Sequence, residues 1–260
     1  MFLQTSFNIK TGSDEVVDLD LTPSGAWVAV TASHQLSFGG TIFPLSSPLW
    51  HPMVRAISDD LALVVGVVGS KSKDLPNGWI FDASGRVLSN FFAGHAIQDV
   101  LVSNRFIVIS YFDESACYGG LEGNGVAVFD SVGNFQFGYR ELFGEKAVEI
   151  ADCYCTCWAD KDRILFYPYT DFPVVSFDLL NKTQTIYDGP PETRGSGALS
   201  SRGDTVYFHS PYNDENGIFR WKVGEDNAVK VGSHSARLRG LTDGKFLAVS
   251  KTGYTIVSPE

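Results

Sequence analysis

The chain has 260 residues, of which 44% are hydrophobic and 19% are charged, so it can bury a sizeable core and does not have the composition of a disordered protein. Its formal net charge of −10 and isoelectric point near 4.9 argue against binding to nucleic acid or to anionic membranes, because both need a basic face. Phe, Tyr and Gly are plentiful and Met is scarce, which favours strands and tight turns over helices.

The N-terminal stretch MFLQTSFNIKTGSDE is β-prone over residues 2–9 and lacks the basic and long apolar regions of a secretory signal. The longest apolar run, LALVVGVVG, has the length of a strand, far short of the roughly 20 residues that a spanning helix needs. Four cysteines without a signal peptide indicate reduced thiols rather than a disulfide framework. We therefore expect a cytoplasmic protein.

One unit then recurs along the chain: an apolar stretch, a short turn rich in Gly, Asp, Asn or Ser, and a strongly β-prone run. The six β-prone runs begin at Trp27, Leu61, Phe106, Ile164, Val206 and Phe246. Most units continue with a second hairpin, as in GWIFDASGRVLSNFF and GVAVFDSVGNFQFGYR. The pattern predicts four antiparallel strands per unit, and the nearest helical candidate, YRELFGEKAVE, is short and contains a Gly.

Four-stranded units at a period of about 40 to 50 residues are typical of a β-propeller. The chain resembles the six-bladed propeller superfamily, which includes NHL-repeat, TolB-like and senescence-marker-protein architectures. This resemblance implies an all-β fold with six four-stranded antiparallel blades and a single domain over residues 1–260. We expect the N-terminal strand to supply the outer strand of the last blade and so to close the ring, since open strand edges favour aggregation.

Charged residues stand in the first strand of several predicted blades, where they are expected to line the axial channel and to pair with one another. They are Asp18, Asp20, Arg55, Asp99, Asp152 and Arg239. No catalytic role is assigned to them.

The fourth unit begins with DCYCTCW, in which Cys153, Cys155 and Cys157 occupy every second position. On a regular strand these side chains share one face. A straight row of thiols fits poorly to tetrahedral zinc, so we interpret the three cysteines as packing residues. The remaining alternative to a pure packing role is that Cys117, from the long loop of the third unit, approaches Cys153.

Propeller topology places the second-to-third-strand loops and the blade connections on one face, and in this chain several of those loops are long. Loops longer than a hairpin needs often carry function on a rigid scaffold. These loops are aromatic and acidic, and their candidate partner-binding residues are Tyr111, Asp113, Glu114, Tyr118, Tyr167, Tyr169, Asp171, Phe172, His209, Tyr212 and Asp214.

Three interpretations of these loops stay open. The aromatic residues cover the blade ends while the carboxylates are solvated, or the carboxylates hold Ca²⁺, or the surface binds a basic protein. No phosphate-binding loop, nucleophile elbow or dinucleotide fingerprint is present, so no catalytic residue is assigned and Ca²⁺ is the one cofactor considered.

The preferred hypothesis is a non-enzymatic, cytoplasmic protein-binding propeller, for example an immunity protein that binds a basic toxin domain. The alternative is a Ca²⁺-dependent hydrolase or lactonase with its site at the channel mouth.

Overall fold

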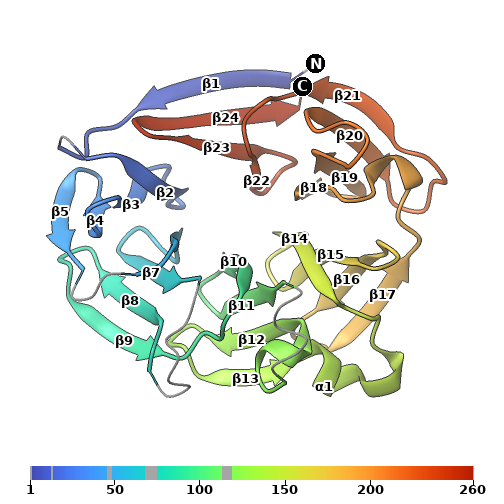
Figure 1. The fold of residues 1–260 in the computed structure, drawn as a ribbon, viewed down its shortest axis with the longest axis horizontal. Coiled ribbons are helices and arrows are strands. Elements are labelled where there is room, and N and C mark those ends of the chain that lie inside the picture. The colour runs from blue at the N-terminus through green and yellow to red at the C-terminus, as the bar shows by residue number, and fades with distance from the viewer. Residues whose placement is uncertain (1, 13, 46–48, 68–74, 113–118, 260) are drawn as a thin grey trace. The chain divides into compact units, whose positions relative to one another are not determined.

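The computed structural model describes residues 2–12, 14–45, 49–67, 75–112 and 119–259. Within these residues the chain forms six four-stranded antiparallel sheets and one short α-helix, α1 (Tyr139–Phe143), which lies in the expected helical candidate (Figure 1). The predicted all-β fold with six four-stranded blades is therefore confirmed. Over the same residues, no helix has the length and apolar character required to cross a membrane.

The chain divides into two compact units, and each is described here by itself. The N-terminal unit consists of Phe7–Ala147 and Val249–Tyr254, and the C-terminal unit consists of Met1–Ser6, Val148–Ala248 and Thr255–Glu260. The expected single domain over residues 1–260 stays a prediction.

Three sheets of the N-terminal unit each contain four strands that follow one another in the chain. The first comprises β2 (Val16–Leu21), β3 (Trp27–Thr31), β4 (Gln35–Phe38) and β5 (Thr41–Pro44). The second comprises β6 (Pro52–Ala56), β7 (Leu61–Gly66), β8 (Gly78–Asp82) and β9 (Val87–Phe91). The third comprises β10 (Ile97–Val102), β11 (Phe106–Tyr111), β12 (Val126–Asp130) and β13 (Phe135–Gly138).

The C-terminal unit contains two further sheets of the same kind. One comprises β14 (Asp152–Trp158), β15 (Arg163–Tyr169), β16 (Val174–Asp178) and β17 (Thr183–Tyr187). The other comprises β18 (Ala198–Arg202), β19 (Thr205–His209), β20 (Gly217–Lys222) and β21 (Val229–Ser233). The predicted β-prone runs are the second strands of the sheets, and only β15 and β19 begin one residue earlier than predicted.

The sixth sheet joins the two ends of the chain in the order β1-β24-β23-β22. Its strands are β1 (Phe2–Asn8), β22 (Arg239–Gly240), β23 (Phe246–Ser250) and β24 (Gly253–Pro259). In the C-terminal unit, the hydroxyls of Ser6 and Thr255 lie 2.9 Å apart, and in the N-terminal unit, the ring of Phe7 stacks on Tyr254 at 4.8 Å between centroids. The expected closure of the last blade by the N-terminal strand is confirmed.

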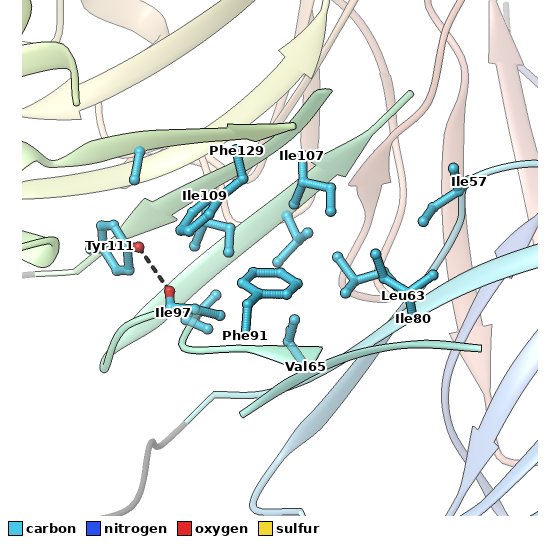
Figure 2. Close-up of a cluster of buried hydrophobic side chains, with 13 residues drawn as sticks. Ile57, Leu63, Val65, Ile80, Phe91, Ile97, Ile107, Ile109, Tyr111 and Phe129 are labelled. Atoms are coloured by element: carbon cyan, nitrogen blue, oxygen red, sulfur yellow. Dashed lines mark hydrogen bonds between the residues drawn. The ribbon is translucent and has the colours of Figure 1, made fainter. Parts of the chain in front are cut away.

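In β7, the second strand of its sheet, alternate side chains belong to two different hydrophobic clusters. Ala62 and Val64 of β7 pack with residues of β3 and β4, whereas Leu63 and Val65 pack with residues of β10, β11 and β12 (Figure 2). Successive side chains of a strand point to opposite faces, so both faces of this strand are buried. This arrangement explains why the sequence of β7 is apolar throughout instead of alternating with polar residues.

The first strands of the N-terminal unit are joined through the buried guanidinium of Arg55 on β6. Its Nη1 lies 2.7 Å from Asp18 Oδ2 on β2, and its Nη2 lies 3.2 Å from Asp99 Oδ1 on β10. Its Nε donates to the carbonyl of Val100 at 2.8 Å. Burial by itself would lower the pKa of Arg55, but the surrounding carboxylates outweigh it and raise the pKa above its usual value. The predicted pairing of first-strand charges is confirmed for these residues.

Deletion of residues 1–10 removes the strand that pairs with β24. Cross-strand pairs contribute roughly 0.2–1 kcal/mol each, so we expect the free energy of unfolding to fall by about 3 kcal/mol, measured by chemical denaturation. Leu3→Glu changes a residue that is 59% exposed on the same strand and serves as the control. A deletion variant as stable as the intact chain would contradict the structural role of β1.

Replacement of Arg55 by Met leaves the carboxylates of Asp18 and Asp99 without their cation. Loss of one partner of a buried ion pair typically costs about 3–5 kcal/mol, and we expect a loss of this size in urea denaturation. Arg86→Met is the matched control, because the Arg86 side chain is 74% exposed in its ion pair with Asp82 and should contribute at most about 1 kcal/mol. Equal losses in the two variants would refute the proposed importance of the buried pair.

Candidate functional site

The strongest candidate site is a group of four packed aromatic rings in the C-terminal unit, which we call the aromatic platform: Tyr154, Tyr169, Phe172 and Tyr212. Tyr154 lies near the start of β14, and Tyr169 is the last residue of β15. Phe172 belongs to the loop between β15 and β16, and Tyr212 belongs to the loop between β19 and β20. Two neighbouring sheets therefore supply the platform from their long-loop ends, as the sequence predicts.

A β-bulge at Tyr154 directs this side chain into the platform. In the pairing of β14 with β15, Cys153 is opposite Pro168 and Cys155 is opposite Tyr167, so Tyr154 is the extra residue. A bulge interrupts the alternation of faces and re-aims side chains. The prediction that the three cysteines share one face is therefore wrong: Cys155 and Cys157 lie on the same face, and the bulge places Cys153 on the other.

All three of these cysteines are buried, as expected for packing residues. Cys155 and Cys157 belong to the hydrophobic cluster beneath the platform, and the Cys155 thiol donates to the carbonyl of Ser196 at 3.3 Å. Cys117 lies outside the described residues, so its expected alternative approach to Cys153 stays a prediction.

The four rings pack mainly edge to face. Tyr154 and Phe172 form the centre, with their ring centroids 5.4 Å apart, and Tyr169 and Tyr212 each contact both of these rings at 5.6–6.2 Å. Tilted and T-shaped arrangements at these separations are the favourable ones for aromatic pairs. Phe172 also packs on the buried ring of Tyr167, which fixes the platform to the core.

Hydroxyl hydrogen bonds hold two of the tyrosines in place. The hydroxyls of Tyr154 and Tyr212 bond to each other, and the buried Tyr167 hydroxyl bonds to Thr193 Oγ1 at 2.9 Å. Burial, the bond to Tyr212 and the nearby carboxylate of Asp152 all raise the pKa of Tyr154 well above its usual value. Tyr154 is therefore a neutral phenol at physiological pH.

The two loops of the platform contain unusual backbone conformations. Phe172 has a φ of 57° and Ser210 has a φ of 61°, in the left-handed region that bulky residues rarely adopt. Such residues cost on the order of 1–3 kcal/mol each and concentrate at functional sites. Gly195, with a φ of 78°, lies directly against the ring of Tyr212, where any side chain would overlap the ring. The loops are therefore fixed in a strained arrangement that exposes specific rings.

The charges around the platform are mainly negative. Asp171 is exposed, and no ion-pair partner is seen for it among the described residues, whereas Asp214 is paired with Lys230. The guanidinium of Arg194 acts on the buried Tyr167 and opposes the rise in its pKa that burial causes.

The structure separates the predicted partner-binding residues into three groups. Those at the surface are Tyr169, Asp171, Tyr212 and Asp214. Those that are buried, at 0–4% exposure, are Tyr111, Tyr167, Phe172 and His209. Those outside the described residues are Asp113, Glu114 and Tyr118.

The core covers the side chains of the buried group, and the partner-binding role expected for them stays a prediction. Tyr111, for example, is 1% exposed and donates its hydroxyl to the carbonyl of Ala93 at 2.8 Å (Figure 2). Phe172 is the buried central ring of the platform, and Tyr167 packs against it from below. Sequence reasoning missed Tyr154, although its position between two small apolar cysteines on a first strand was visible in DCYCTCW.

No group of three or more His, Cys, Asp or Glu side chains that could hold a metal ion is found in the described part of the chain.

His209 illustrates how a residue predicted to bind a partner instead supports the fold. Its ring is buried, and its Nε2 donates to the carbonyl of His234 at 2.9 Å. Burial lowers the pKa of His209, and the bond to His234 and the charge of Asp214 only partly offset this effect.

The lowered pKa of His209 makes stability depend on pH. Between the unfolded-state pKa of about 6.5 and the lower folded-state pKa, the unfolded chain binds more protons, so stability is highest above pH 6.5 and falls as the pH falls. We expect the free energy of unfolding to decrease from pH 7.5 to pH 5, and to decrease less in His209→Gln. His51→Gln, at an exposed histidine, is the control, and an unchanged slope in His209→Gln would contradict this role.

No protein-family model and no curated protein matches the sequence. Among solved structures, the chain is similar to a catalytically inactive virginiamycin B lyase from Staphylococcus aureus bound to quinupristin, with 10% identity, 100% of both chains covered and a TM-score of 0.59. It is also similar to BamB from Moraxella catarrhalis, with 11% identity, 100% and 98% coverage and a TM-score of 0.56.

A third similar structure is Hsv2 from Kluyveromyces lactis, with 14% identity, a TM-score of 0.56 and coverage of 92% of this chain and 72% of that one. At such identities the similarity concerns the fold alone. Together with the six four-stranded sheets and the N-terminal strand in the last of them, these comparisons identify the fold as a six-bladed β-propeller.

Proposed function

We propose that this chain is a non-enzymatic protein-binding propeller that contacts a basic partner protein through the aromatic platform. One observation carries the proposal: two exposed tyrosine rings, Tyr169 at 39% and Tyr212 at 55% exposure, both pack against the buried ring of Phe172. The fold by itself does not distinguish binding from catalysis, since a lyase is among the proteins that share it.

Fixed, exposed tyrosines are well suited to protein recognition. Tyr is enriched among the residues that contribute most to interface affinity, because it offers a large contact area and a polar group. Ordering a mobile side chain on binding costs roughly 0.5–1.5 kcal/mol, and this cost is already reduced for rings that pack against a core. The contacts of both tyrosines with Phe172 therefore favour binding.

The charge of the chain supports a basic partner. The exposed residue Asp171 directly precedes Phe172 in the chain, and the whole chain carries a formal charge of −10. Opposite charges speed the encounter of two proteins and orient them. An immunity protein that neutralises a basic toxin domain is the concrete form of this proposal. That role, the cytoplasmic location and the alternative of a Ca²⁺-dependent hydrolase stay predictions.

The test uses the full chain as immobilised bait in extract of the source cell, followed by affinity measurement with the purified captured protein. We expect Tyr169→Ala combined with Tyr212→Ala to weaken binding at least tenfold, because two anchor rings are lost. Asp171→Lys should slow association, and the effect should diminish at high salt.

Phe135→Ala and Asp226→Lys are matched controls, since both change exposed residues that are not part of the platform. Capture that is equally strong with the double tyrosine variant would refute the platform as the binding surface. Elemental analysis and thermal melts in EDTA and in Ca²⁺ distinguish the Ca²⁺-dependent hydrolase from the binding protein. Bound metal and a higher melting temperature in Ca²⁺ would favour the hydrolase.

A further inference from the structure

We infer that the group recognised by the platform is an arginine side chain of the partner, placed over the exposed rings of Tyr169 and Tyr212 and paired with the carboxylate of Asp171. This inference rests on the proposed protein-binding function and specifies its chemistry. It follows from the rings that are exposed, from the charges around them and from the geometry that each type of cation requires.

The exposed rings favour a cation. The face of a tyrosine ring is electrostatically negative and attracts a cation that lies within about 6 Å of its centre. Tyr169 and Tyr212 each contact both rings of the central pair, Tyr154 and Phe172, and both remain exposed to solvent. The platform therefore offers an approaching cation two exposed tyrosine rings.

The surrounding charges also favour a cationic ligand. The carboxylate of Asp152 acts on the hydroxyl of Tyr154, and Asp171 is exposed in the loop that carries Phe172. Of the cationic side chains nearby, Lys230 is paired with Asp214, and Arg194 acts on the buried Tyr167. An incoming cation thus meets the carboxylates of Asp152 and Asp171 and the tyrosine rings, and of these two cationic side chains the exposed guanidinium of Arg194 is the one that opposes it.

Arginine fits this surface better than lysine. Its guanidinium is planar and weakly hydrated, so it can stack on an aromatic ring while its edge donates two parallel hydrogen bonds to a carboxylate. The ammonium of lysine is compact and strongly hydrated and gains less from a ring face. The exposed tyrosine rings and the exposed carboxylate of Asp171, which comes from the same loop as Phe172, match both features of the guanidinium.

The probes are three Gly-Ser peptides of equal length that carry arginine, lysine or the uncharged isostere citrulline at the same positions. Binding to the full chain is followed through the aromatic NMR signals of the protein. We expect the arginine peptide to bind at least threefold more tightly than the lysine peptide, and the citrulline peptide to shift no tyrosine signal. The affinity for the arginine peptide should fall as salt increases.

Variants test the residues separately. Tyr169→Ala and Tyr212→Ala should each weaken arginine-peptide binding by about fivefold, the equivalent of one cation–π contact. Tyr212→Phe keeps the ring and loses only the hydroxyl bond to Tyr154, so it should bind the arginine peptide more tightly than Tyr212→Ala. Asp171→Asn should reduce the preference for arginine over lysine, and Asp226→Asn is its exposed control. Melting curves verify that each variant is folded.

Equal binding of the citrulline peptide would overturn the inference that a charge is recognised, and equal binding of the lysine peptide would overturn the preference for arginine. If the platform variants lose the captured partner while no arginine peptide binds, the protein-binding function stands and this inference fails. If the arginine peptide binds through the platform while partner capture is unaffected by the variants, the protein-binding function fails.

Discussion

The fold depends on one constraint: its second strands are apolar on both faces, so each needs a covered surface on either side. In the N-terminal unit, adjacent residues of β7, such as Leu63 and Val64, belong to different hydrophobic clusters. In the C-terminal unit, Val206 and Tyr207 of β19 do the same. A sheet of this kind is stable only between two others, which explains why the structural unit repeats and why the N-terminal strand completes the last sheet.

Each unit packs the first strands of its own sheets together, and the chemistry of these contacts differs between the two units. In the N-terminal unit, the guanidinium of Arg55 links three strands through carboxylates and a backbone carbonyl. In the C-terminal unit, small residues allow close approach: Gly240 lies against the carbonyl of Leu199, and the hydroxyl of Ser201 donates to the carbonyl of Trp158 at 3.0 Å. The cysteines of β14 are also small and buried, so they fit the close packing of first strands in the C-terminal unit.

The aromatic platform lies at the boundary between the hydrophobic core and the solvent. Its buried ring, Phe172, belongs to the same hydrophobic cluster as Tyr167, whereas Tyr169 and Tyr212 are exposed to solvent. The bulge at Tyr154 and the positive φ of Phe172 hold the rings in arrangements that a regular strand and turn would not produce. The stability of the sheets thus offsets the cost of this local backbone distortion, and the distortion creates a surface suited to recognition.

The strands and the hairpins could be predicted from the sequence, because they depend on local signals: alternation, apolar runs and turn residues. The pairing of the chain ends could be predicted because the last unit would otherwise lack its outer strand and leave an open edge. The turn DASGR is an example, since Asp82 accepts backbone hydrogen bonds from Ser84 and Arg86 within the same hairpin. That the long-loop ends carry the functional site stays a prediction. The tertiary structure alone decided that Tyr111, Tyr167 and His209 are buried, and that Tyr154 joins Tyr212. Burial and contact between sheets depend on residues far apart in the chain, and one extra residue in a strand changes which face every preceding side chain occupies.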